Sequence, residues 1–283
     1  MIAVVYSGSR YANWKLADKG SIIAEFKTLG INPFFNDERF ITQLLNKTNE
    51  LVTYAERIKK IYFFGAGASS PDRKKIIATS FSNFFRYGKI SVEHDLKAAA
   101  LATCGDHEGV VGIIGSGSNV AYYNGRSVKE NNNGLGYILS DEGSANWLGR
   151  RLLKSFLNHT LPEPLLNKFN KKFGLERKQI LDKVYRQPQP VLFLTSFSEF
   201  FAENANDTYV KETVKEGFDL YFKNYVTPIT ETNPGAPLHF AGTIAFAFEP
   251  WLREVAGNYG LEIASVVKAP IFNVLTYYTN KNQ

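Results

Sequence analysis

The sequence predicts an α/β protein whose two halves open in the same way. Each half begins with an apolar strand, a turn of glycine and serine residues, and a returning strand, over residues 2–17 and again over 110–123. In the first half the expected order of elements is β-β-β-α-β-α-β-α. A chain of 283 residues is long for one hydrophobic core and suits two domains. The recurring opening therefore favours a duplicated architecture.

After its hairpin, the first half continues with a third strand and then alternates helices and strands. Alternation of apolar and polar residues predicts the third strand. Asp37 and Pro71 stand where residues that begin helices are common. The expected elements are a strand over 21–28, a helix over 37–56, a buried strand over 61–64, a helix over 71–86, a strand over 90–92 and a helix over 96–103.

The second half repeats the hairpin and then becomes mostly helical. Residues 126–129 are a candidate third strand after those at 110–114 and 119–123. Apolar residues spaced three and four apart from Val210 to Tyr225 predict the core-facing side of a helix, not a ligand site. The other expected elements are helices over 162–173, 177–185, 191–203 and 243–258, strands over 238–242 and 263–267, and a last helix over 270–279.

Composition and charge indicate an ordinary globular chain. Hydrophobic residues make up 44% of the sequence and charged residues 21%. No apolar run is long enough to span a bilayer and no secretory signal pattern is seen, so we expect a cytoplasmic protein without a membrane partner. The single cysteine, Cys104, excludes a disulfide framework, a thiolate zinc site and a cysteine-ligated cluster. The net charge of +6 is scattered, which fits anionic ligands, and no nucleic-acid partner is expected.

The two small-residue turns are candidate phosphate-binding loops. Glycine beside serine lets backbone N–H groups converge on one point, and hydroxyl groups add donors for an anion such as a nucleotide phosphate. Taken alone, the first turn fits an ordinary hairpin, and its recurrence favours the phosphate-binding interpretation. The residues concerned are Ser7, Gly8, Ser9 and Arg10 in the first turn and Gly115, Ser116, Gly117 and Ser118 in the second.

A longer pattern gives the chain a family resemblance. The stretch Gly134-Leu135-Gly136-Tyr137-Ile138-Leu139-Ser140-Asp141-Glu142-Gly143-Ser144-Ala145 is similar to the pattern G-x-G-x-x-x-G-D-E-G-S-A. Together with Gly30-Ile31-Asn32, Asp95, the second turn and Gly242, it makes the whole chain resemble the N-acetylglucosamine kinase branch of the BadF/BadG/BcrA/BcrD ATPase family. That resemblance implies the two-domain actin-like ATPase (ribonuclease H-like) fold around a central cleft. The implied domains are 1–107, joined by a C-terminal helix within 270–283, and 108–269.

The resemblance implies an ATP-dependent amino-sugar kinase. Such an enzyme transfers the γ-phosphate of ATP to the 6-hydroxyl of N-acetylglucosamine or a close relative, with Asp95 as the base. Both turns would hold the phosphates, and Gly242 and Thr243 would lie near the adenosine. The implied sugar-binding residues are Asn32, Asp95, Asn119, Asp141 and Glu142. N-acetylmuramic acid and glucosamine are alternative sugars, and a homodimer is one option for the assembly.

Each polar residue of this set also has an ordinary structural explanation. Asp95 is suited to cap the helix expected over 96–103. Asp141 and Glu142 would favour the N-terminus of the helix that follows them. Asn119 is a common turn residue. However, the glycines on both sides of the acid pair suggest close approach of the backbone to a ligand, which a helix cap does not require.

The first turn departs from the family pattern, which reads D-S-G-S-T-K-T-D-W. Here the matching stretch is Tyr6-Ser7-Gly8-Ser9-Arg10-Tyr11-Ala12-Asn13-Trp14. Tyr6 replaces the acid that would position Mg²⁺, and a neutral phenol is a poor ligand for a hard cation. Two hypotheses follow. Either the chain is a working kinase in which Arg10 contacts phosphate, or it is a catalytically impaired homologue that binds amino sugar as a sensor or regulator.

Overall fold

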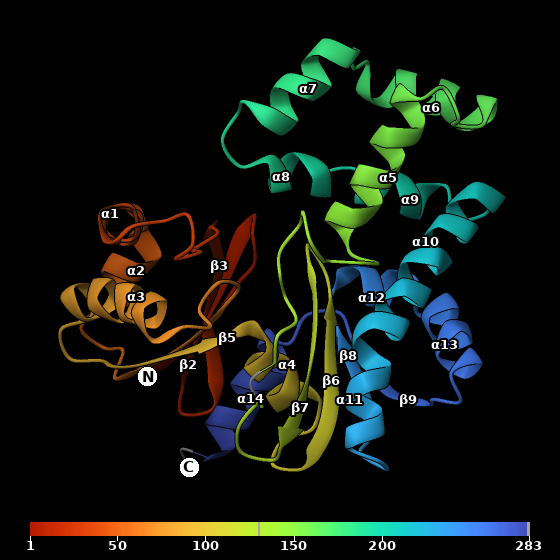
Figure 1. The fold of residues 1–283 in the computed structure, drawn as a ribbon. Helices are drawn as coiled ribbons and strands as arrows, with labels where there is room; N and C mark the ends of the chain where they lie inside the picture. Colours follow the sequence, from red (N-terminus) through yellow and green to blue (C-terminus); the bar gives the residue numbers. More distant parts are fainter. Residues whose placement is uncertain (130, 282–283) are drawn as a thin grey trace. The chain divides into compact units, whose positions relative to one another are not determined.

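The chain forms two units, each built on its own β-sheet (Figure 1). The computed structural model describes residues 1–129 and 131–281, so position 130 and the end of the expected C-terminal segment, 282–283, lie outside the described residues. The first unit contains Met1–His107, Tyr123–Val128 and the segment that begins at Ala269. The second unit contains Glu108–Tyr122 and the chain from Lys129 to Lys268.

A five-stranded sheet forms the centre of the first unit. Strands β1 (Ile2–Ser7), β2 (Tyr11–Asp18) and β3 (Ser21–Leu29) form the expected antiparallel meander. Strands β4 (Lys60–Gly65) and β5 (Lys89–His94) add to it in the order β3-β2-β1-β4-β5. Strands β1, β4 and β5 run parallel to one another. Their carboxyl ends therefore meet at one edge of the sheet, where loops can converge on a ligand.

Helices pack on both faces of this sheet. They are α1 (Glu38–Lys47), α2 (Asn49–Tyr54), α3 (Pro71–Phe84), α4 (Asp95–Thr103) and α14 (Ile271–Lys281). One apolar core joins the sheet to α1 and α3 through Ile41, Leu45, Ile77 and Phe81, and another joins it to α4 and α14 through Ala98, Leu101, Ile271 and Val274.

The expectation of one helix over 37–56 is wrong at Thr48. Asp37 does cap α1, because its carboxylate accepts a hydrogen bond from the Phe40 N–H at 2.8 Å. At Thr48 the backbone turns extended, with φ −94° and ψ 103°, and a new helix starts. The Thr48 hydroxyl donates to the Leu44 carbonyl at 2.8 Å. Side-chain bonds of this kind compete with the helix, which explains a break that the apolar spacing does not reveal.

The second unit has a four-stranded sheet in the order β7-β6-β8-β9. Its strands are β6 (Glu108–Ile114), β7 (Ser118–Asn124), β8 (Leu238–Ala241) and β9 (Ile263–Val267), with β6, β8 and β9 parallel. The expected third strand over 126–129 is wrong, since only a single bridge joins Tyr123 to Val128. The Asn124 side chain accepts from the N–H groups of Arg126 and Ser127. Those donors are then used by a turn and are not available to a strand.

Helices make up most of the second unit. They are α5 (Ala145–Leu157), α6 (Glu163–Phe173), α7 (Arg177–Tyr185), α8 (Pro190–Thr195), α9 (Ser198–Glu203), α10 (Thr208–Tyr221), α11 (Thr227–Thr232), α12 (Thr243–Ala247) and α13 (Glu249–Asn258). A π-helical turn, η1 (Phe222–Val226), connects α10 to α11. The helices expected over 191–203 and 243–258 are each divided in two. The second break comes at Phe248, just before Pro250, whose ring cannot continue a regular helix.

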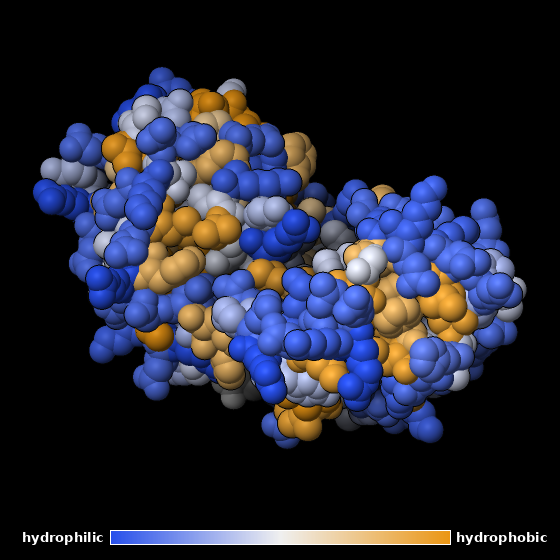
Figure 2. Space-filling model, turned by 90° about the horizontal axis from the view of Figure 1, so that it is seen from above, coloured by the Kyte–Doolittle hydropathy of each residue, from blue (hydrophilic) through white to orange (hydrophobic). Residues whose placement is uncertain are grey.

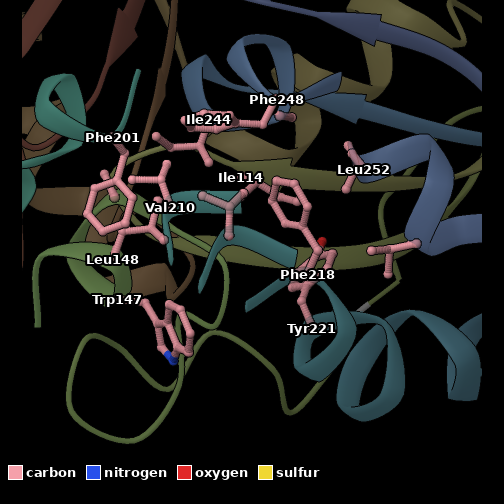
Figure 3. Close-up of a cluster of buried hydrophobic side chains, with 14 of the residues drawn as sticks. Ile114, Trp147, Leu148, Phe201, Val210, Phe218, Tyr221, Ile244, Phe248 and Leu252 are labelled. Atoms are coloured by element: carbon pink, nitrogen blue, oxygen red, sulfur yellow. The ribbon is translucent and has the colours of Figure 1, made fainter. Parts of the chain in front are cut away.

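The core of the second unit brings residues from distant parts of the chain together. Figure 3 shows Ile114 of β6, Leu148 of α5, Phe218 and Tyr221 of α10, and Leu252 of α13 converging on one apolar cluster. The apolar stripe predicted from Val210 to Tyr225 is confirmed as core for Val210, Val214, Phe218 and Tyr221. Tyr225 is partly buried and packs against the same core, while its hydroxyl meets a carboxylate.

The face of the protein seen in Figure 2 is mostly polar, with separate apolar patches. Three strongly exposed aliphatic side chains, Leu135, Ile138 and Leu139, lie close together in the sequence, in the loop that precedes α5. Within residues 1–129 and 131–281, no helix combines the length and apolar character needed to cross a membrane.

Candidate functional site

In the first unit, three loops leave the same edge of the sheet. Ser7 ends β1, Gly65 ends β4 and His94 ends β5, and the three are neighbours in the strand register. Asp95 follows immediately as the first residue of α4. The first turn and Asp95 are therefore brought to one edge, as two parts of one site require.

Asp95 is not the N-cap of its helix. His94 occupies the cap position, and the Asp95 carboxylate accepts a local bond from the Leu96 N–H, at 3.0 Å. Burial raises the pKa of Asp95, against the opposing influence of His94. A carboxylate with a raised pKa takes up a proton more readily, which is the property of a general base. The capping explanation of this residue is wrong.

Tyr6 lies close enough to Asp95 for the two groups to affect each other electrostatically. Burial raises the pKa of Tyr6, and the negative charge of Asp95 raises it further. The phenol therefore stays protonated and neutral at any physiological pH. In the described part of the chain, no three His, Cys, Asp or Glu side chains come together in a way that could hold a metal ion. Tyr6 therefore offers no carboxylate that could hold Mg²⁺ at the first turn.

Ser7 joins the first turn to the loop that carries Asn32. Its hydroxyl donates to the Ile31 carbonyl at 2.9 Å and accepts from the Ile31 N–H at 2.8 Å. The side chain is 1% exposed. Asn32 in turn lies against Gly67, where a β-carbon would come within 2.1 Å of its side-chain oxygen. Ser7 holds the Asn32 loop in place, and a direct contact of its hydroxyl with phosphate stays a prediction.

We expect Ser7→Ala to destabilise the first unit by about 1–3 kcal/mol, because it leaves a buried N–H and a buried carbonyl of Ile31 without their partner. Urea denaturation followed by circular dichroism measures the change. Ser9→Ala is the matched control in the same turn and is expected to change stability by less than about 0.5 kcal/mol. Equal stabilities of the two variants would contradict the clamping role of Ser7.

The remaining predicted residues of the first turn lie nearer the surface. The N–H of Gly8 donates to the Tyr11 carbonyl at 3.0 Å, which closes a tight turn. Arg10 is exposed, and its guanidinium lies 5.1 Å from the centre of the Tyr11 ring. Stacking leaves the edge donors of a guanidinium available, so Arg10 can still clamp an anion.

In the second unit, the turn over 115–118 rests on the start of α5. The Gly115 carbonyl accepts from the Ala145 N–H at 2.9 Å, and the Ser116 carbonyl accepts from the Asn146 side chain at 2.7 Å. Gly242 touches this turn from the end of β8. With φ +125°, it has a backbone suited to glycine, and a β-carbon there would lie 2.3 Å from the Ile114 carbonyl oxygen. Thr243 follows as the exposed first residue of α12.

Asp141 is the most tightly held acid of the predicted set. It is 7% exposed, has a positive φ of 69°, and precedes α5, whose N-cap is Ser144. One carboxylate oxygen accepts from the Ser118 N–H at 2.9 Å and the other from the Asn146 side chain at 2.7 Å. Burial raises the pKa of Asp141, and these two hydrogen bonds oppose that effect. Neither Asp141 nor Glu142 lies in the first turn of α5.

Asn119 and Glu142 complete the predicted set. Asn119 lies within β7, so its explanation as a turn residue is wrong, and its carbonyl accepts from the Tyr221 hydroxyl at 2.9 Å. The Glu142 carbonyl accepts from the Ser118 hydroxyl at 2.9 Å. Ser118 thus ties the second turn to the acid pair, as Ser7 ties the first turn to the Asn32 loop.

Three residues of this region escaped sequence reasoning. Asn146 is fully buried between Ser116 and Asp141. Arg150 donates to the carbonyls of Ile138 and Ser140 from the next turn of α5. Tyr225 donates to Glu142 at 2.7 Å. The spacing of Asn146 and Arg150, four residues apart after the glycine-rich stretch, is the one signal that could have indicated them.

A pocket of about 690 Å³ in the second unit is separate from these residues. Its walls include the start of β8 at Leu238 and the chain just before β9 at Leu261. Gly242 lies at the opposite end of β8. The residues predicted for the phosphate turn and the adenosine in this unit therefore lie at the carboxyl ends of β6 and β8, away from this pocket.

Solved structures of other proteins are similar to this chain. No family model matches the sequence. A solved structure from Porphyromonas gingivalis, described as a candidate N-acetylglucosamine kinase, is similar over 100% of both chains, with 35% sequence identity and a TM-score of 0.93. A candidate N-acetylglucosamine kinase from Chromobacterium violaceum shares 15% identity over 98% of this chain and 99% of its own, with a TM-score of 0.66.

A more distant structure agrees in fold. The ROK family glucokinase of Streptomyces griseus, solved with glucose and AMPPNP, shares 14% identity over 99% of this chain and 98% of its own, with a TM-score of 0.54. At such low identity the likeness concerns the fold alone. The predicted actin-like ATPase fold is confirmed. Because the likeness to the Porphyromonas gingivalis protein spans the whole chain at 35% identity, the chain belongs to the N-acetylglucosamine kinase-like proteins among the sugar kinases of this fold.

Proposed function

We propose that the protein is an ATP-dependent amino-sugar kinase that phosphorylates the 6-hydroxyl of N-acetylglucosamine or a close relative. The observation that carries the proposal is the retention of Asp95, Asp141 and Glu142 in a chain of this family, with the carboxylate of Asp141 held by Ser118 and Asn146. The carboxylates of Asp95, Asp141 and Glu142 and the side chain of Asn119 offer the acceptors and donors that sugar hydroxyl groups require.

In the proposed reaction the sugar 6-oxygen attacks the γ-phosphorus of ATP. The new oxygen–phosphorus bond forms as the bond to the β,γ-bridging oxygen breaks, and ADP leaves with the electron pair. Asp95 accepts the hydroxyl proton. The turn over 115–118 and Gly242 would hold the phosphates and the adenosine, and Arg10 would offset negative charge on the transferring group. Since Tyr6 offers no carboxylate that could hold Mg²⁺, no step is assigned to a metal there.

One observation favours a second candidate, a sugar-binding protein with little or no turnover. A neutral Tyr6 phenol stands where the family pattern has the acid that positions the metal. Metal and phosphate positioning provide most of the rate enhancement in phosphoryl transfer, so this single change can remove activity and leave the sugar site intact. Such a protein would act as a sensor or regulator of amino-sugar supply.

The Tyr6→Asp variant separates the two candidates. A coupled assay of ADP release with ATP, Mg²⁺ and N-acetylglucosamine measures turnover, and calorimetric titration with sugar alone measures binding. If the protein is a working kinase, the wild-type protein itself shows turnover. If it is a sugar-binding protein, the wild-type protein binds the sugar with little or no turnover, and Tyr6→Asp, which restores the carboxylate, raises turnover about a hundredfold or more. Wild type that neither binds nor phosphorylates any amino sugar would contradict both candidates.

A further inference from the structure

A chain of hydrogen bonds connects Ser140 to Glu142 through Tyr225. The Ser140 hydroxyl donates to the Tyr225 oxygen at 3.2 Å, and the Tyr225 hydroxyl donates to a Glu142 carboxylate oxygen at 2.7 Å. An ionised carboxylate can only accept, so the direction of the chain is fixed. Burial raises the pKa of Tyr225, and the bond to Glu142 acts in the same direction, so the phenol remains a donor at neutral pH.

This chain of hydrogen bonds depends on a residue at which the sequence differs from the family pattern. Ser140 stands where the pattern G-x-G-x-x-x-G-D-E-G-S-A has glycine, and a glycine has no hydroxyl to offer. Ser140 is 3% exposed, so its hydroxyl faces the protein and not the solvent. A buried hydroxyl without a partner would cost free energy, and Tyr225 provides that partner.

The π-helical turn brings Tyr225 to this position. Helix α10 ends at Tyr221, and η1 widens the next turn. The Tyr221 hydroxyl donates to the Asn119 carbonyl at 2.9 Å, and the two tyrosine rings are 6.0 Å apart. One helical segment therefore contacts both strand β7, which carries Asn119, and the loop that carries Glu142. Single π-helical turns are frequent at functional sites, where they redirect a side chain.

The rest of the acid loop is fixed by other groups. Arg150 donates to the Ser140 carbonyl at 3.1 Å, and Ser118 donates to the Glu142 carbonyl at 2.9 Å. These bonds hold the backbone and not the Glu142 side chain. In the described part of the chain, the Tyr225 hydroxyl donates a hydrogen bond to this carboxylate, and the charge of Arg150 also acts on it. The Tyr225 hydroxyl occupies one oxygen and leaves the other able to accept a hydrogen bond.

We propose that Tyr225, supported by Ser140, is a positioning residue that holds the Glu142 carboxylate ready for a hydroxyl group of the amino sugar. This inference rests on the proposed sugar site. A side chain that is already fixed loses less conformational entropy when it binds, so the contact raises sugar affinity without touching the sugar.

Calorimetric titration of Tyr225→Phe with N-acetylglucosamine and, separately, with ATP tests the role. We expect the sugar Kd to rise about tenfold, because the variant loses a hydrogen bond to a charged group, and the ATP Kd to stay unchanged. Tyr259→Phe is the matched control, since its hydroxyl donates to the Asp219 carboxylate at 2.9 Å elsewhere in the second unit. An unchanged sugar Kd in Tyr225→Phe, or an equal loss in the control, would overturn the proposal.

A double-mutant cycle tests whether Tyr225 acts through Glu142. Glu142→Ala alone is expected to weaken sugar binding, and adding Tyr225→Phe to it should change the Kd by less than about twofold, because alanine leaves the Tyr225 hydroxyl without this acceptor. A full tenfold loss in the Glu142→Ala background would mean that Tyr225 acts by another route. Ser140→Gly, which restores the family residue, should weaken binding about two- to threefold, because Tyr225 keeps its bond to the carboxylate but loses its own donor.

A crystal structure of each variant tests the role of Tyr225 even if no sugar binds. In Tyr225→Phe the Glu142 carboxylate should lose its fixed position, seen as higher B-factors or a second conformer, and in Tyr259→Phe it should not. An unchanged Glu142 side chain in Tyr225→Phe overturns the positioning role. A Glu142 side chain that is released in Tyr225→Phe, together with a wild type that binds no amino sugar, would keep the positioning role and reject the proposed function, so the two failures are distinguishable.

Discussion

Replacing Asp95 with asparagine is expected to lower the rate of phosphoryl transfer about a thousandfold. A positioned general base contributes roughly a hundred- to ten-thousandfold, and an amide cannot accept the proton of the sugar hydroxyl. Asparagine keeps the side-chain oxygen that accepts from the Leu96 N–H, so the start of α4 is preserved. The coupled assay measures kcat in wild type, or in Tyr6→Asp if only that variant turns over, with Asp95→Asn added in the same background.

Asp95→Asn should be more stable than wild type although its turnover is lower. Burial raises the folded-state pKa of Asp95 above its ordinary value. The native state then binds a proton more tightly than the unfolded chain, and this contribution to stability is lost as the pH rises through the folded-state pKa. At pH 7.5, far above the ordinary pKa of aspartate, keeping this carboxyl group in a desolvated position costs stability, a cost that asparagine avoids. We expect a higher Tm for Asp95→Asn at pH 7.5, and a difference that shrinks toward pH 4.

Asp106→Asn is the control for charge removal in the first unit. Its carboxylate is exposed and bonds to Lys281 and Tyr277, which lower its pKa. Because the folded-state pKa of Asp106 is lowered, its carboxylate stabilises the fold at any pH above its unfolded-state pKa. Asp106→Asn should therefore be no more stable than wild type at pH 7.5. It should keep full activity. Loss of turnover together with a fall in the Tm of Asp95→Asn would indicate damage to the fold and contradict its role as the base.

The sequence was most informative where local chemistry decides the structure. The turn around Gly8, the cap at Asp37 and the alternation over 21–28 depend on neighbours within a few residues, and all three are present in the structure. The glycine-rich stretch before Ala145 likewise indicated an irregular loop, because glycine adopts a positive φ readily, and Gly134, Gly136 and Gly143 all have one.

Contacts between residues far apart in the chain could not be predicted from the sequence in the same way. Ser7 was expected to face phosphate, and its hydroxyl bonds to Ile31, 24 positions away. Tyr225 fits the spacing of a core stripe, but periodicity indicates only the side of the helix on which a residue lies. The hydroxyl at the far end of the Tyr225 ring could contact apolar side chains or a carboxylate. The outcome depends on Glu142, 83 positions away, and on a π-helical turn that has no known sequence signal.

Replacing Gly117 with alanine is expected to weaken sugar binding about tenfold or more and to leave the fold intact. A β-carbon at this position would lie 2.8 Å from one carboxylate oxygen of Asp141 and 3.0 Å from the other. The side-chain end must then move, which breaks or lengthens its hydrogen bonds from Ser118 and Asn146. A carboxylate that is displaced by a few tenths of an ångström loses geometry that sugar hydroxyl groups require.

Calorimetric titration with sugar and with ATP identifies which ligand depends on Gly117. Gly257→Ala is the matched control, because a β-carbon there meets no atom within 4 Å and the residue lies near the end of α13. It should leave both affinities unchanged. If Gly117→Ala weakens ATP binding alone, the glycine serves close approach of the phosphates and not of Asp141. If it weakens sugar binding alone, the glycine is required because the second turn packs against Asp141. The two turns would then be alike because each is bonded through a serine, Ser7 or Ser118, to a loop that carries predicted sugar-binding residues.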